Sequence, residues 1–178
     1  MSNRPTQGKG SRPAPGRGWP VQAPISVWSA GRAIVAVMEP YQEAGRAELD
    51  QLVDVQLRAE HDGDIEAILA SMTETVIHDL VGSLDNPIQG LAAVRGRYRD
   101  VLAATVHERD VPLRRLYGPN FVLDEHVWSG RLTGQAFGLE GHGRWISHRA
   151  VWLLEIHAGR IARETVWNDV EAIRRQLR

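Results

Sequence analysis

Histidine and carboxylate side chains within strand-like runs are the residues of this chain best suited to chemistry. In the run Arg144–His157 the even positions from Ile146 to Ile156 are all apolar except His148, so this histidine is expected on the inward face of a strand. A buried neutral imidazole can accept or donate a proton near neutral pH. The alternative is a core histidine satisfied by a single hydrogen bond. His148 is therefore a candidate proton carrier.

A second set of polar residues follows the same alternation in Phe121–Thr133. Asp124 and His126 share one side of this run with Trp128. That side is either a polar pocket wall or the solvated outer face of the sheet. His78, in the short run VIHDLV, is similarly placed among apolar neighbours. We therefore expect His78 and His126 to line a cavity if these faces point inward.

Asp169 ends the last strand-like run, one residue after Asn168 and two after Trp167. Partial burial at the rim of a cavity would raise the pKa of this carboxyl and make it a usable general acid or base. The alternative is that Asn168 or Asp169 caps the following helix, with Glu171 completing a capping box. Asp169 and His148 are the candidate catalytic pair.

The stretch from Phe121 to Asp169 should position these residues, because three strand-like runs follow one another there with glycine-containing breaks between them. It holds four of the six tryptophans. We expect an aromatic cavity wall made of Trp128, Trp152 and Trp167 from this stretch. A helix predicted further upstream adds the ring of Tyr98.

The remaining elements precede and follow this stretch. Apolar spacing predicts amphipathic helices and short strands: a helix over 41–60, a helix after an Asp64 cap with the stripe Ile65, Ile68, Leu69 and Met72, a strand over 76–81, a helix over 91–102, a strand over 111–117 and a helix after Asp169. Helices first and strands later indicate an α+β domain, with helices on one face of a mostly antiparallel sheet. A cavity is expected at the open end of such a curved sheet.

Composition restricts the chemistry. The chain of 178 residues has no cysteine, which rules out a disulfide framework, a thiolate metal site and a cysteine nucleophile. Its apolar runs are too short for a membrane span, and the expected location is the cytoplasm.

Charge is unevenly distributed. Residues 1–38 are rich in proline, glycine and arginine and contain no acid, so we expect a disordered basic tail, and a domain over 39–178. Two alternatives are a targeting peptide and a translation start at Met38. The rest of the chain is acidic, which gives no reason to expect a nucleic-acid partner.

Cofactor motifs are missing from the sequence. The seven histidines show no helical His-x-x-x-His pair and no compact spacing with carboxylates, so we expect no metal site. The glycines of TGQAFGLEGHG do not lead from a strand into a helix, which indicates a hairpin loop and not a phosphate cradle. We expect a protein without a cofactor.

The succession of short motifs resembles a known family. The motifs are His61-x-Gly63-Asp64, Val76-Ile77-His78-Asp79, Gly90-Leu91-x-x-Val94, Trp128-Ser129-Gly130, Phe137-Gly138-Leu139, Gly159-Arg160-Ile161, Glu164, Trp167, Asp169 and Gln176-Leu177. In this order and spacing they are similar to the SnoaL-like polyketide cyclases of the nuclear-transport-factor-2-like superfamily. The resemblance covers about Glu43 to Leu177.

This resemblance implies a cone-like α+β barrel, usually homodimeric through its sheet, with a cofactor-free pocket. In these cyclases an aspartate at the end of the last long strand is the general acid/base of an intramolecular aldol condensation, and Asp169 matches that position. Family members commonly have Gly-Thr-His where this chain has Gly130-Arg131-Leu132. His148 or His126 would therefore have to replace the missing histidine.

Three functional hypotheses follow. The first is a cofactor-independent cyclase acting on an apolar, carbonyl-containing small molecule. The second is a non-catalytic ligand-binding or dimerisation module of the same fold. The third, known among relatives, is epoxide hydrolysis, for which Asp124, Arg149 and Asp169 would have to converge around a water molecule.

Overall fold

An open six-stranded sheet organises residues 43–178, the part of the chain that the computed structural model describes. The expected basic tail, residues 1–38, lies outside the described residues. The strand order is β2-β1-β8-β7-β4-β3. The strands are β1 (Met72–Leu80), β2 (Ile88–Gln89), β3 (Thr105–Gly118), β4 (Phe121–Leu132), β7 (Arg144–His157) and β8 (Arg160–Asn168).

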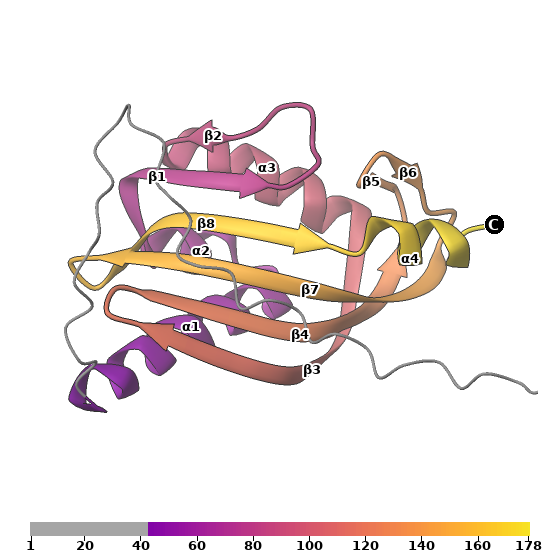
Figure 1. Cartoon of the computed structure of the whole chain (residues 1–178). Helices are drawn as coiled ribbons and strands as arrows, with labels where there is room; N and C mark the ends of the chain where they lie inside the picture. The colour runs from indigo at the N-terminus through magenta and orange to yellow at the C-terminus, as the bar shows by residue number, and fades with distance from the viewer. Residues whose placement is uncertain (1–42) are drawn as a thin grey trace, which may run out of the picture. The chain divides into compact units, whose positions relative to one another are not determined.

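The sheet is mixed. Strands β1 and β8 pair in parallel, and the other neighbouring strands pair antiparallel, as expected for a mostly antiparallel sheet. It is curved (Figure 1), but its edge strands β2 and β3 do not pair with each other. The cone-like barrel that the resemblance implied is therefore an α+β fold with an open, curved sheet.

Three helices pack on one face of this sheet (Figure 1). The helices are α1 (Glu43–Asp62), α2 (Ile65–Ala70) and α3 (Leu91–Ala104), with α4 (Val170–Gln176) at the end of the chain. Val53 of α1, Ile68 of α2 and Val94 of α3 are fully buried in one core with β-strand residues. The helices were expected in the bend of the sheet, and this packing confirms it. Among the described helices, none is both long and apolar enough to span a membrane.

Local sequence explains where α2 begins. Asp64 caps α2, as predicted, because its carboxylate accepts a hydrogen bond from the Ala67 amide at 3.0 Å. Met72 was expected on the stripe of this helix, but it begins β1. Helix α2 ends at Ala70, and Met72 is fully buried at the start of the strand. The glycine loop contains the small hairpin β5 (Gln135–Ala136) and β6 (Leu139–Glu140), as expected.

Strand alternation sets which side chains face the helices. On β7 the even positions from Ile146 to Leu154, including His148, are buried. On β4 the inward side chains include Asp124 and His126, which are 3% and 2% exposed, so the outward alternative is wrong for this run. Strand pairing then places these faces beside the even positions of β8.

Candidate functional site

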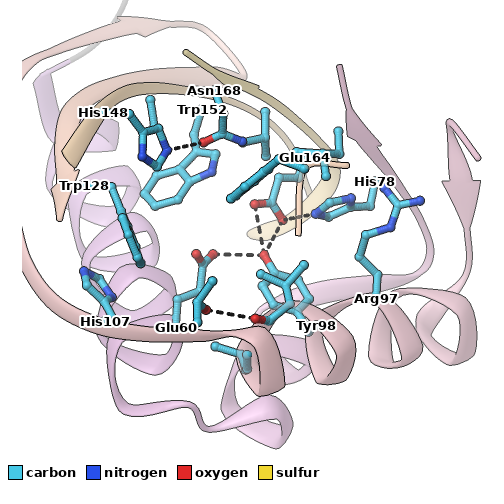
Figure 2. A pocket seen from close by; sticks show the side chains of 17 residues that line it. Glu60, His78, Arg97, Tyr98, His107, Trp128, His148, Trp152, Glu164 and Asn168 are labelled. Atoms are coloured by element: carbon cyan, nitrogen blue, oxygen red, sulfur yellow. Dashed lines mark hydrogen bonds and ion pairs between the residues drawn. The ribbon is translucent and has the colours of Figure 1, made fainter. Parts of the chain in front are cut away.

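A cavity lies between the concave face of the sheet and helices α1 and α3 (Figure 2). Its inner volume is about 100 Å³, and the void including its open mouth is about 750 Å³. Most of its wall is apolar, and its polar groups come from α1, α3, β1, β3, β7 and β8. The polar and aromatic lining residues are Glu60, His78, Arg97, Tyr98, Thr105, His107, Trp128, Phe137, His148, Trp152, Glu164 and Asn168.

Two carboxyl groups and a phenol meet on one side of this cavity (Figure 2). The Tyr98 hydroxyl lies 2.9 Å from Glu60 Oε1 and 3.0 Å from both carboxylate oxygens of Glu164. Gln56 donates to Glu60 Oε1 at 2.9 Å, and Ser71 in turn donates to Gln56 at 2.5 Å. Helices α1 and α3 are thus linked to β8 by hydrogen bonds.

This network requires a shared proton. A phenol has one hydrogen and can donate to only one carboxyl, so the Tyr98 oxygen can bond with the second only if that carboxyl is protonated. Burial, reinforced by the charge of Glu60, raises the pKa of Glu164 well above its usual value. Burial likewise raises the pKa of Glu60 to about 7 and that of Tyr98 above its usual value. At neutral pH the site therefore holds a neutral carboxylic acid.

His78 on β1 lies beside this network. Its Nε2 is 4.0 Å from Glu164 Oε2, and its ring meets the Tyr98 ring edge-on at 5.5 Å. The side chain is 5% exposed, and burial lowers the pKa of His78 to about 4. A neutral imidazole leaves the nearby acid without a cationic partner, which favours the protonated form of Glu164.

His148 on β7 faces the same cavity. Its Nε2 lies 2.9 Å from Asn168 Oδ1, and among the described residues its Nδ1 has no hydrogen-bond partner. An amide oxygen accepts, so Nε2–H donates and Nδ1 carries the lone pair. Burial lowers the pKa of His148, which keeps the ring neutral. The His148 ring packs against the rings of Trp128 and Phe137, with ring centroids 5.4 and 5.9 Å apart. Asn168 thus orients a free base.

The remaining predicted residues divide between the cavity and other places. Tyr98, Trp128, Trp152, His78 and His148 line the cavity as expected. His126 faces inward but lines a second, neighbouring cavity, and its ring packs on Trp152 at 4.0 Å.

Trp167 was expected to line the cavity, and this expectation is wrong. Its side chain is 40% exposed, and it does not belong to the lining. The reason is the strand register, since Glu164, Val166 and Asn168 occupy the inward positions of β8 and Trp167 falls between two of them.

Asp169, the candidate catalytic carboxylate, caps α4. Its Oδ1 accepts a hydrogen bond from the Ala172 amide at 2.9 Å, as in the capping alternative. The side chain is exposed and lies outside the cavity lining. The Asp169 carboxylate therefore does not line the cavity, although its negative charge partly offsets the effect of burial on the pKa of His148.

The three residues considered for epoxide hydrolysis do not converge. Asp124 binds Arg115 at 2.6 Å, and Arg149 binds Glu125 at 3.1 Å from the exposed face of the sheet. Arg97, which does line the cavity, donates to the Asn86 side chain and to a backbone carbonyl and not to a carboxylate pair. This arrangement gives no support to a hydrolytic water between two carboxylates.

Glu60 and Glu164 were not among the predicted site residues. Both carry a signal in the sequence. Glu164 shares the inward side of its strand with Val166 and Asn168, and Glu60 continues the helical spacing of Val53 and Gln56 on the buried side of α1. A carboxyl on a buried stripe is unusual enough to be a site candidate. The sequence does not show that the side chains of Glu60 and Glu164 both contact the Tyr98 hydroxyl.

A scan against family models matches SnoaL-like polyketide cyclase over residues 51–177. Comparison with curated proteins finds no match. Among solved structures, TsrD from Streptomyces laurentii is 22% identical, with a TM-score of 0.63, over 74% of this chain and 96% of its own. An NTF2-like protein from Burkholderia xenovorans is 18% identical, with a TM-score of 0.60, over 74% and 97%. A LEH-like epoxide hydrolase from M. tuberculosis is 18% identical, with a TM-score of 0.59, over 74% and 90%.

Proposed function

Because the chain belongs to the SnoaL-like polyketide cyclase family, we propose that it is a cofactor-independent acid/base catalyst of an intramolecular aldol-type reaction. The observation that carries this proposal is the buried carboxyl of Glu164, hydrogen-bonded to Tyr98 beside an apolar cavity whose lining includes His148, with a ring nitrogen that has no hydrogen-bond partner among the described residues. The wall is mostly apolar and the inner volume is about 100 Å³, which favours a small apolar substrate with carbonyl groups.

The two sides of the cavity have complementary roles. His148 Nδ1 takes a proton from the carbon next to a carbonyl group, while Tyr98, backed by the acid form of Glu164, gives a proton to that carbonyl oxygen. The resulting enol carbon attacks a second carbonyl carbon and forms the new carbon–carbon bond. The enol proton returns to Tyr98 and Glu164, and the imidazolium proton goes to the new hydroxyl oxygen. Both catalytic groups end in their starting protonation states.

This mechanism assigns the carboxyl chemistry to Glu164. The family resemblance assigns it to Asp169. The two are separable by conservative amide substitutions. Asn is as good a helix cap as Asp, so Asp169→Asn should preserve the fold of α4. Glu164→Gln keeps the size of the side chain but removes the acid.

The test follows hydrogen–deuterium exchange next to the carbonyl group in a panel of small apolar ketones and keto esters in D₂O, by NMR. Glu164→Gln should lower the enzyme-dependent rate by about 10²- to 10⁴-fold. Asp169→Asn should lower it far less, since it keeps the helix cap and removes only a carboxylate charge that acts to raise the pKa of His148. Loss of exchange in Asp169→Asn, with full exchange in Glu164→Gln, would refute the assignment to Glu164.

A non-catalytic binding module is the second candidate. It is favoured by the small inner volume and by the departure at Gly130-Arg131-Leu132 from the family pattern. It predicts that compounds of the same panel bind, shift the tryptophan fluorescence and are recovered without deuterium. Enzyme-dependent exchange in any of them would rule it out.

A further inference from the structure

Two histidines and an aspartate come together where the second cavity borders the first. His61 lies near the end of α1, and His107 and Asp110 lie on β3. One ligand atom from each residue lies within 4.8 Å of the other two. His61 is far from the others in sequence, so no spacing motif could reveal this cluster.

Several polar atoms around Asp110 are buried without a hydrogen bond among the described residues. They are His107 Nε2, Asp110 Oδ1 and both ring nitrogens of His126. His107 Nε2 is 2.8 Å from Asp110 Oδ2, yet the two do not meet hydrogen-bond geometry. A buried polar atom without a partner costs about 1–3 kcal/mol. Such a concentration of them indicates a missing partner.

His126 is the second, independent observation. It is 2% exposed, and its Nε2 lies 3.8 Å from Asp110 Oδ1 while its Nδ1 lies 3.5 Å from Asp124 Oδ2. Its ring is thus directed at the cluster, between two carboxylates. A histidine next to a metal-binding carboxylate is a common way to orient that ligand.

The nearby arginine does not supply the missing partner. Arg115 binds Asp50 and Asp54, each at 2.9 Å, and Asp124 at 2.6 Å. Its ion pairs in the described residues are therefore with these three carboxylates and not with Asp110. A cation at His61, His107 and Asp110 would give His107 and Asp110 the partner that Arg115 does not supply.

We propose that His61, His107 and Asp110 bind one divalent transition-metal ion, with Zn²⁺ the best fit. Two imidazoles and a carboxylate are a donor set that suits Zn²⁺ better than Mg²⁺ or Ca²⁺. Zinc bonds of about 2.0–2.2 Å place ligand atoms about 3.4 Å apart, so the three ligands must rearrange to bind an ion, although His107 Nε2 and Asp110 Oδ2 already lie 2.8 Å apart. His61 is exposed and can move, whereas the His107 ring is stacked on Trp128 at 5.3 Å.

This site does not depend on the proposed aldol chemistry. His107 also lines the first cavity, so a bound ion would lie between the two cavities. Three protein ligands would leave a position for a water molecule or a ligand oxygen. The sequence-based expectation of no metal site rested on spacing alone, which is blind to residues joined only by the fold.

The test uses the full chain without a histidine tag, stripped of metal by a chelator and titrated with ZnSO₄ by calorimetry. We expect saturable binding of one ion, weakened at least about tenfold in His61→Ala. His142→Ala removes an exposed histidine outside the cluster and should bind as the unaltered chain does. Circular dichroism checks that both variants are folded.

Cobalt provides a second readout. Co²⁺ bound by imidazole and carboxylate ligands should give a visible absorption band, which Zn²⁺ displaces and which Asp110→Asn alters. Absence of saturable binding, or equal weakening by His61→Ala and His142→Ala, would overturn the proposal.

Discussion

The Tyr98 hydroxyl is the atom on which the chemistry of the cavity depends, because it joins two carboxyl groups that cannot both be ionised. For Glu164 the cost of burying a charge exceeds the stabilisation that a Tyr98 hydrogen bond gives to the carboxylate, so its pKa rises. The charge of Glu60 acts in the same direction. His78 cannot offset these two effects on the pKa of Glu164, because burial keeps the His78 ring neutral. The result is an acid that stays protonated at neutral pH.

Protein stability should depend on pH through these groups. The pKa values of Glu60 and Glu164 are raised in the folded state, so their contribution to stability is present below about pH 4.5 and is lost as pH rises through the folded values, about 7 for Glu60. His78, with a pKa lowered to about 4, does the opposite and favours the folded state as pH rises from about 4 to 6.5. The two effects offset each other in that window.

Above about pH 6.5 only the carboxyl groups remain, so the free energy of unfolding should fall by about 1 kcal/mol or more between pH 6.5 and 8.5. Urea unfolding followed by tryptophan fluorescence at several pH values measures this. Glu164→Gln should reduce the slope. A free energy of unfolding that is constant or rises over this range would contradict the raised pKa values of Glu60 and Glu164.

Strand β4 carries the cavity wall and is held close to β3 by a glycine. A Cβ atom on Gly130 would lie 2.1 Å from the Val106 carbonyl oxygen and 2.7 Å from the Trp128 ring. Any side chain there must displace either the neighbouring strand or the ring that lines the cavity. Gly96, inside α3, has open space around the same position.

This contrast gives a matched pair of substitutions. Gly130→Ala should destabilise the domain by about 1–3 kcal/mol through overpacking. Gly96→Ala should stabilise it by up to about 1 kcal/mol, since alanine favours a helix interior. Thermal unfolding monitored by circular dichroism compares the two. Equal effects of the two substitutions would show that the close approach at Gly130 is unimportant.

At the scale of elements, alternation in the sequence was informative wherever a strand is buried on one face. It placed His148 correctly on an inward face and Asp64 correctly at a helix start, but it left open which face of the sheet carries His126. It failed where one element passes into another. Asp169 follows the last inward residue of β8 and turns into α4, so local capping and not strand register decides its direction.

At the scale of the whole domain, the site depends on contacts between distant segments. The Tyr98 network joins α1, α3 and β8, and the histidine cluster joins α1 to β3. The family resemblance predicts this fold but not these contacts, because they follow from how the helices lie on the curved sheet. The homodimer that the resemblance implies stays a prediction.

The central claim, a neutral carboxylic acid of Glu164 in the cavity, is most directly tested by infrared difference spectroscopy of the carboxyl carbonyl stretch. The measurement is best made at about pH 8, above the pKa of about 7 for Glu60. The full chain should show the band of a protonated carboxyl, Asp169→Asn should retain it, and Glu164→Gln should lose it. Absence of the band from the full chain, or its persistence in Glu164→Gln, would contradict a neutral Glu164.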